Sequence, residues 1–310
     1  MVARVAERES QIVLGLDPDP GALWPGLAGE GGSGGQSTEE SAERAARAVL
    51  CHCRAVIDAT ASACVAVKLQ LARFELLGAP GWQALESVAA HARERGLLVI
   101  ADGKRGDIDV SAAAYAGALF GGRETPFGQL SGLGADLVTV NPLMGVDALE
   151  PFVARAREDG GGVLVLVRTS NPGAADVEDL RLEGGEAVWE RIAAIVERLG
   201  AGGVGAAGLS DVGAVVGATV PAHLARAREL MPRAVFLLPG VGAQGGRVED
   251  LAPAFAAGRA GGLITASRSI VNAYLAAGGG AGDGAAPGEA ARAEAERLRE
   301  TAWTLSLVPA

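Results

Sequence analysis

The feature that most restricts the fold of this chain is a series of short apolar runs that alternate with longer segments of helical periodicity. Each run is apolar throughout and is bounded by Gly, Pro or Asp, which is typical of parallel strands covered on both faces. Eight such runs occur, over residues 11–17, 64–70, 97–103, 136–142, 162–168, 213–219, 234–240 and 261–267. Helical periodicity separates them, for example over residues 38–62, 82–95, 146–157, 185–198, 221–230 and 246–257.

Eight strands that are each followed by a helix predict an α/β fold of the (β/α)8 TIM-barrel type. A doubly wound open sheet uses the same units, but the turn after the first run, LGLDPDPG, lacks the Gly-x-Gly-x-x-Gly fingerprint of dinucleotide binding. We expect a single catalytic barrel domain over residues 1–276, with a flexible Gly-rich loop insertion at about residues 25–36. Residues 277–310 are expected to form a low-complexity linker and a C-terminal helix.

Composition excludes several classes of function. The 310 residues are 49% hydrophobic and 21% charged with a net charge of −10, so no global positive field attracts nucleic acid. No apolar run reaches the roughly 18 residues of a membrane span, and the first ten residues lack the apolar region of a signal peptide. We therefore expect a cytoplasmic protein with neither a membrane nor a nucleic-acid partner.

Three closely spaced cysteines, Cys51, Cys53 and Cys64, indicate buried thiols and no disulfide framework.

The distribution of lysine is the most informative detail of the composition. Of 27 basic residues only Lys68 and Lys104 are lysines, so arginine serves wherever a surface cation is sufficient. Lysine can act as an acid, a base or a Schiff-base former, whereas arginine stays charged. Both lysines lie at the carboxyl ends of predicted strands, which is where the active site of a TIM barrel is found. Asp17, Gln70 and Asp102 lie at the same ends.

The segment ADGKRGDI, residues 101–108, concentrates charge at the end of the third predicted strand. Asp102 and Lys104 are two residues apart on a strand, so their side chains are expected to point to the same side. Asp107 follows in the loop, and a lysine between two carboxylates has its ammonium form stabilised. This favours a local cation and proton donor over a Schiff base, although a purely structural Asp-Lys-Asp network is the alternative.

A Gly-rich turn, LLPGVGAQGGR over residues 237–247, follows the seventh predicted strand. Its backbone N–H groups can cradle a phosphate, and Arg268 stands where the next helix begins, with Ser267 before it. The loops after strands seven and eight commonly hold phosphate in such barrels. An ordinary tight turn is the alternative reading. No histidine or cysteine cluster has metal-ligand spacing, so we expect no metal.

ADGKRGDI resembles the Asp-x-Lys-x-x-Asp signature of the orotidine 5′-phosphate decarboxylase family, in its long bacterial branch. Further segments are similar to the family over about residues 11–275, namely LGLDP, VKLQLARFE, VTVNPLMGVDALEPF, RTSNPG, SDVGAVVGAT and PGVGAQGG. The resemblance implies cofactor-independent decarboxylation of orotidine 5′-phosphate to uridine 5′-phosphate in pyrimidine biosynthesis. It also implies a homodimer whose active sites are shared between subunits.

The resemblance assigns roles to individual residues. Lys104 is expected to protonate C6 of the pyrimidine, Asp102 to stand beside the substrate carboxylate, and Asp107 and Ile108 to reach the partner's site. Asp17 and Lys68 would hold the ribose hydroxyls and Ser170 the pyrimidine edge, while the phosphate would be bound by Pro239, Gly240, Gln244 and Arg268. The chain departs from the family pattern at three positions, Asp109, Leu143 and Ser267.

Two other functions are compatible with the same residues. One is a decarboxylase or aldolase of another phosphorylated sugar on the same barrel, which would need metal ligands or a lysine of lowered pKa. The other is a catalytically silent protein that binds a phosphate ligand on a retained scaffold.

Overall fold

Eight parallel strands close into a barrel in this computed structural model, which describes residues 1–27, 38–242, 245–276 and 286–307. Around the barrel the order is β1, β2, β3, β6, β7, β8, β9 and β10, and β10 pairs with β1. The TIM barrel predicted from the alternating runs is confirmed. The strands are Ile12–Leu16, Ala66–Gln70, Leu98–Arg105, Leu137–Val140, Gly162–Arg168, Val212–Val216, Phe236–Leu238 and Gly262–Ala266 in that order.

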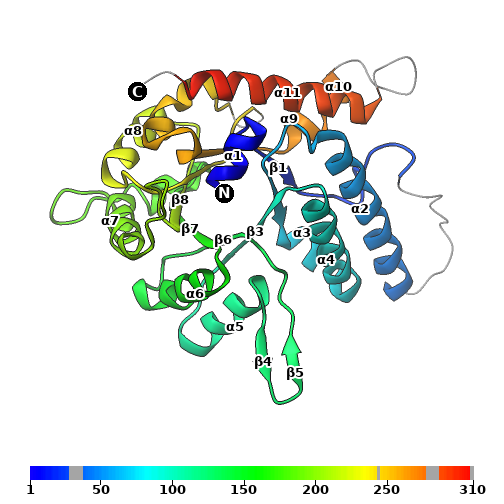
Figure 1. Ribbon diagram of the computed structural model, residues 1–310, viewed down its shortest axis with the longest axis horizontal. Helices are drawn as coiled ribbons and strands as arrows, with labels where there is room; N and C mark the ends of the chain where they lie inside the picture. The colour runs from blue at the N-terminus through cyan, green and yellow to red at the C-terminus, as the bar shows by residue number, and fades with distance from the viewer. Residues whose placement is uncertain (28–37, 243–244, 277–285, 308–310) are drawn as a thin grey trace.

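Helices surround the barrel (Figure 1). The longer ones are α2 (Thr38–Thr60), α4 (Gly78–Glu94), α5 (Asp109–Leu119), α6 (Val146–Asp159), α7 (Val188–Gly200), α8 (Pro221–Leu230) and α11 (Pro287–Leu305). Short helices are α1 (Val2–Arg8), α3 (Leu71–Glu75), α9 (Arg268–Val271) and α10 (Ala273–Ala276). Within the described ranges no helix is both long enough and apolar enough to cross a membrane.

The apolar strands are covered on both faces, as expected for parallel strands. One cluster of buried side chains fills the barrel interior and includes Val13, Ile100 and Leu263, while a larger cluster lies between the strands and the surrounding helices. Helix α1 closes the amino-terminal end of the barrel, because its Val5 belongs to the interior cluster and is only 1% exposed. The opposite end, where the strands finish, stays open for a ligand.

Three local features differ from the sequence predictions. A hairpin of β4 (Arg123–Thr125) and β5 (Gly128–Leu130) projects beside α5 and was not anticipated (Figure 1). The segment predicted as a helix over 246–257 is a 3₁₀ helix, Val248–Ala257. Cys53 and Cys64 are buried free thiols as expected, whereas Cys51 is exposed.

The C-terminal helix is part of the folded barrel assembly. Helix α11 packs against α2 and the 3₁₀ helix 248–257, and buries Ala291, Ala295, Leu298 and Ala302 in the main core. In Figure 1 it runs across one side of the ring of helices. Most of the Gly-rich insertion and most of the predicted linker lie outside the described residues.

His52 on α2 makes the stability of the β1–α2 region depend on pH. Its side chain is buried, its Nδ1 accepts a hydrogen bond of 3.1 Å from the Trp24 backbone N–H, and its ring meets the Trp24 ring edge-on. Burial lowers the pKa of His52 to about 4 from 6.5. The unfolded chain therefore binds a proton between these pH values that the folded chain does not, so acidification through this window destabilises the fold by about 3 kcal/mol at most.

His52→Asn is the matched test, because an asparagine Oδ1 occupies the place of the histidine Nδ1 and does not titrate. Urea unfolding of both proteins between pH 7 and pH 4 should give a steeper loss of stability for the parent chain. Parallel pH profiles of the two proteins would contradict the assignment.

Candidate active site

A cavity of about 730 Å³ opens at the carboxyl end of the barrel. Eight of the predicted site residues line it, contributed by six different strands or the loops that follow them: Asp17, Lys68, Asp102, Lys104, Ser170, Pro239, Gly240 and Arg268. Its volume lies within the 300–1,000 Å³ that is typical of small-molecule sites.

Asp102 at the end of β3 is the centre of the charged group. Its Oδ2 accepts a hydrogen bond of 2.6 Å from Lys68 Nζ, and its Oδ1 accepts one of 2.6 Å from Lys104 Nζ. Asp17 Oδ1 lies 3.6 Å from Lys68 Nζ. The lysine that lies between two carboxylates is therefore Lys68, and Asp102 lies between two lysines. This corrects the sequence expectation that Lys104 would be flanked by Asp102 and Asp107.

Asp102 and Lys68 remain charged at neutral pH. Burial by itself would raise the pKa of Asp102, but the two ammonium groups outweigh burial and hold this pKa at about 2. Burial would also lower the pKa of Lys68, yet the carboxylates of Asp102 and Asp17 outweigh it and the pKa is raised. Attraction between the opposite charges offsets the free-energy cost of removing these groups from water, so the ions can be buried.

The backbone around Lys104 is irregular. Pairing between β3 and β6 shifts register between Ala101 and Arg105, and Lys104 has a φ of 48°, in the left-handed region. Thr139 on β6 stabilises this conformation, since its hydroxyl accepts the Lys104 N–H at 3.0 Å and donates to Asp102 Oδ1 at 2.9 Å. Asp102 and Lys104 do face the same cavity, but through this bulge and not through regular strand alternation.

The predicted phosphate region is only partly as expected. The N–H groups of Gly242, Gly245 and Gly246 donate to carbonyls inside the turn, so these three amides do not form an open anion nest. Helix α9 has four residues, so its dipole contributes little. Arg268 lines the cavity and forms no ion pair with any described residue. It is the group here most suited to an anion.

Ser267 is accommodated although it departs from the family pattern. A Cβ at position 15 on β1 would come within 1.8 Å of the Ser267 hydroxyl, so the glycine there makes room for this serine. Gln244 lies outside the described residues.

Asp107 and Ile108 do not line the cavity of their own chain. Ile108 is 53% exposed, and Asp107 Oδ1 accepts the Ile108 N–H at 2.8 Å. Other large apolar side chains are exposed on α5, on the β4–β5 hairpin and in the loop after β6: Val110, Tyr115, Phe127, Leu130, Leu143 and Met144.

Sequence reasoning missed four polar residues of the cavity wall, Arg73, Thr139, Glu178 and Thr265. Arg73 belongs to α3, directly after the second strand, and its place in VKLQLARFE is the one signal that was available. Thr139 is a single polar residue in an apolar strand, and Glu178 lies ten residues beyond the end of β7, so neither has a local signature.

An eight-stranded barrel with a cavity and charged side chains at the carboxyl ends of its strands is typical of TIM-barrel enzymes, whose active sites lie at that end. Residues 10–277 match the model of the orotidine 5′-phosphate decarboxylase / HUMPS family. The orotidine 5′-phosphate decarboxylase of Deinococcus radiodurans is 50% identical over 216 residues, which cover 69% of this chain and 74% of that protein. That of Rhodopirellula baltica is 43% identical over 222 residues, or 72% of each chain.

The structure is similar to that of the Leishmania donovani OMP decarboxylase, with a TM-score of 0.72 and 31% identity over 99% of both chains. The family-model match and the structural match include the whole barrel and the charged site. The chain belongs to the orotidine 5′-phosphate decarboxylase / HUMPS family.

Proposed function

We propose that Lys104 and Asp102 carry out the reaction of this enzyme, the decarboxylation of orotidine 5′-phosphate to uridine 5′-phosphate without a cofactor. The observation that carries the proposal is the Lys68–Asp102–Lys104 group, in which each lysine Nζ lies 2.6 Å from an oxygen of Asp102. Family membership and relatives named for this activity support the reaction itself.

The chemistry follows from the positions of these charges. When carbon dioxide leaves, the electron pair of the broken C–C bond stays on C6 of the pyrimidine. The Lys104 ammonium stabilises this carbanion and then transfers a proton to C6, so that one proton is consumed in each turnover. Asp102 keeps its negative charge because its pKa is about 2, and it holds the ammonium of Lys104 at a defined place.

The remaining site residues are assigned to binding. Asp17 and Lys68 hold the ribose hydroxyls, and Ser170 contacts the edge of the pyrimidine. Pro239, Gly240, Gln244 and Arg268 bind the phosphate, for which the main support is Arg268, a cation of the cavity wall that has no ion-pair partner among the described residues. Binding energy from the phosphate can then be used to order the loops around the reacting carbon.

We further propose that the enzyme is a cytoplasmic homodimer in which Asp107 and Ile108 complete the partner's site. The support is that neither residue lines its own cavity, that Ile108 is exposed, and that further large apolar side chains are exposed on α5, the β4–β5 hairpin and the loop after β6, of which Phe127 is 98% exposed and Leu143 80%. Large apolar patches on a soluble protein commonly mark an interface.

The experiment is to follow the absorbance of orotidine 5′-phosphate with the purified full chain, in chelator and with no added cofactor. We expect stoichiometric conversion to uridine 5′-phosphate. We also expect that borohydride, which reduces a lysine Schiff base to a stable adduct, leaves no substrate covalently attached to the protein. A folded protein that leaves the substrate unchanged would contradict the proposal, and trapping at Lys104 would favour Schiff-base chemistry on another phosphorylated sugar. Binding of the nucleotide without turnover would indicate a silent binding protein.

A further inference from the structure

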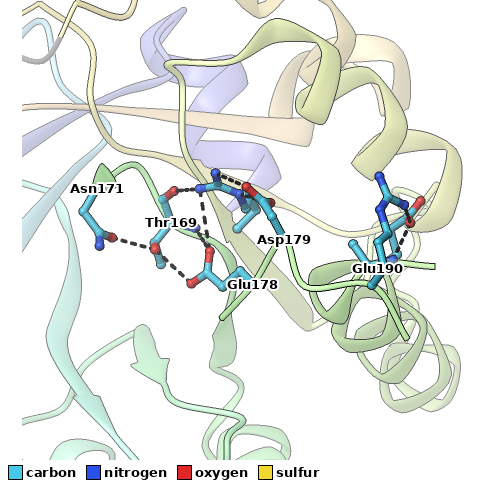
Figure 2. Close-up of polar contacts among 8 residues, drawn as sticks. Thr169, Asn171, Glu178, Asp179 and Glu190 are labelled. Carbon is cyan, nitrogen blue, oxygen red and sulfur yellow. Dashed lines mark hydrogen bonds and ion pairs between the residues drawn. The ribbon is translucent and has the colours of Figure 1, made fainter. Parts of the chain in front are cut away.

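Two adjacent side-chain pairs fasten the segment after β7 onto the end of that strand. Arg168 makes a bidentate ion pair with Asp179, with Nε–Oδ1 at 2.8 Å and Nη2–Oδ2 at 2.9 Å. Glu178 accepts a hydrogen bond of 2.8 Å from the Thr169 N–H, and the Thr169 hydroxyl lies 2.9 Å from Glu178 Oε1 and 2.7 Å from Asn171 Oδ1 (Figure 2). We call these four residues the clasp.

The clasp closes a short loop that begins at a substrate-binding residue. Positions 168 and 169 are joined to 179 and 178, so residues 170–177, which include the 3₁₀ helix Pro172–Asp176, form a closed connection whose first residue is Ser170. The clasp side chains are largely sheltered, with exposures of 12% for Arg168, 19% for Glu178 and 33% for Asp179. Hydrogen bonds from Arg168 lower the pKa of Asp179, so this carboxylate stays ionised at neutral pH. Bidentate bonds between charged groups are the stronger kind and fix orientation as well as distance.

The end of β8 confines Ser170 from the other side. The Gly217 N–H donates to the Arg168 carbonyl at 2.7 Å. A Cβ on Gly217 would lie 2.8 Å from Ser170 Cα and 3.0 Å from its backbone nitrogen, which is closer than real contacts allow. The backbone of Ser170 is therefore held between the clasp and a glycine that lets it approach.

The far end of the same segment is anchored independently. Glu190 on α7 accepts the Ala187 N–H at 2.9 Å and a hydrogen bond of 2.8 Å from Arg226 Nε on α8 (Figure 2). Hydrogen bonds to charged side chains therefore hold both ends of the connection between β7 and α7. Residues 170–177 lie between these two anchored ends.

We propose that Glu178 and Asp179 are positioning residues for Ser170, which they fix in its substrate-binding place before the substrate arrives. The inference rests on the proposed role of Ser170 at the pyrimidine edge. When Ser170 is already in place, less conformational entropy is lost as the substrate binds. A displacement of about 1 Å at a reacting site can lower the rate by up to about a hundredfold. Neither carboxylate needs to touch the substrate.

The test is a double-mutant cycle between Glu178 and Ser170, read as kcat/KM for orotidine 5′-phosphate. Glu178→Ala should lower kcat/KM about tenfold, equal to about 1.4 kcal/mol. Glu178→Gln should restore most of this, because the amide can accept the Thr169 N–H and donate to its hydroxyl. In the Ser170→Ala background, Glu178→Ala should change kcat/KM less than about twofold, since the residue acts through Ser170. Asp179→Ala should behave in the same way.

Two further variants separate positioning from general destabilisation. Glu186→Gln removes a carboxylate from the same segment whose ion-pair partner is Arg191, and should leave kcat/KM unchanged. Gly217→Ala displaces Ser170 without altering the clasp charges, and should reproduce the loss of kcat/KM in a protein with a cooperative thermal transition.

Unchanged kcat/KM in both Glu178→Ala and Asp179→Ala would overturn the proposal. So would a full effect of Glu178→Ala in the Ser170→Ala background, because Glu178 would then act on the substrate directly. Failure of the proposed function gives a different result, since the unsubstituted enzyme would then show no turnover at all.

Discussion

Replacing Lys104 with Ala should lower kcat for orotidine 5′-phosphate by at least about 10⁴-fold, because the substitution removes both the proton donor and the cation beside the developing carbanion. The fold should survive. Asp102 keeps Lys68 Nζ at 2.6 Å and the Thr139 hydroxyl at 2.9 Å, so its buried charge stays compensated. The Lys104 side chain is itself 43% exposed, so little apolar packing is lost. Single-turnover kinetics and thermal unfolding on the same preparation are the measurements.

Lys104→Arg is the informative companion variant. It retains a positive charge near Asp102, but a guanidinium with a pKa above about 12 gives up a proton poorly. We expect turnover to remain severely reduced while product binding is largely kept. Activity of either variant within about tenfold of the parent enzyme would exclude Lys104 as the proton donor, since general acid catalysis is commonly worth 10²- to 10⁴-fold.

Mixing two inactive variants should restore activity if the active sites are shared between subunits. Asp107→Ala and Lys104→Ala subunits, co-refolded in equal amounts, give hybrid dimers in half of the population. Each hybrid contains one intact site, built from Lys104 of one subunit and Asp107 of the other. The mixture should therefore recover about a quarter of the parent activity, from the random association of symmetric dimers.

The matched control uses two substitutions within one cavity. Asp102 and Lys104 line the same pocket of the same chain, so hybrids of Asp102→Asn and Lys104→Ala contain no intact site and should stay inactive. If Asp107→Ala and Lys104→Ala hybrids, isolated with two different affinity tags, are equally inactive, then Asp107 does not complete the partner's site.

The barrel and the position of the active site are features that local sequence patterns determine. Each of the eight apolar runs became a barrel strand, with bounds that moved by only a few residues, because continuous apolar character reports burial on both faces of a parallel strand. The carboxyl ends of these strands converge at one end of a TIM barrel. Polar residues at strand ends, such as Lys68 and Lys104, could therefore be assigned to one site without knowledge of their contacts.

The pairing of these charges was decided only by the tertiary structure. Lys68 and Asp102 are 34 residues apart and meet because the register of β2 against β3 places Gln70 opposite Asp102. Local periodicity carries no information on that register or on the bulge that turns Lys104 to a φ of 48°. For the same reason Thr139, on the next strand of the barrel, and Glu178, on the loop after β7, could not be recognised beforehand. Their roles arise from hydrogen bonds to Lys104 and to Thr169, which exist only once the barrel has closed.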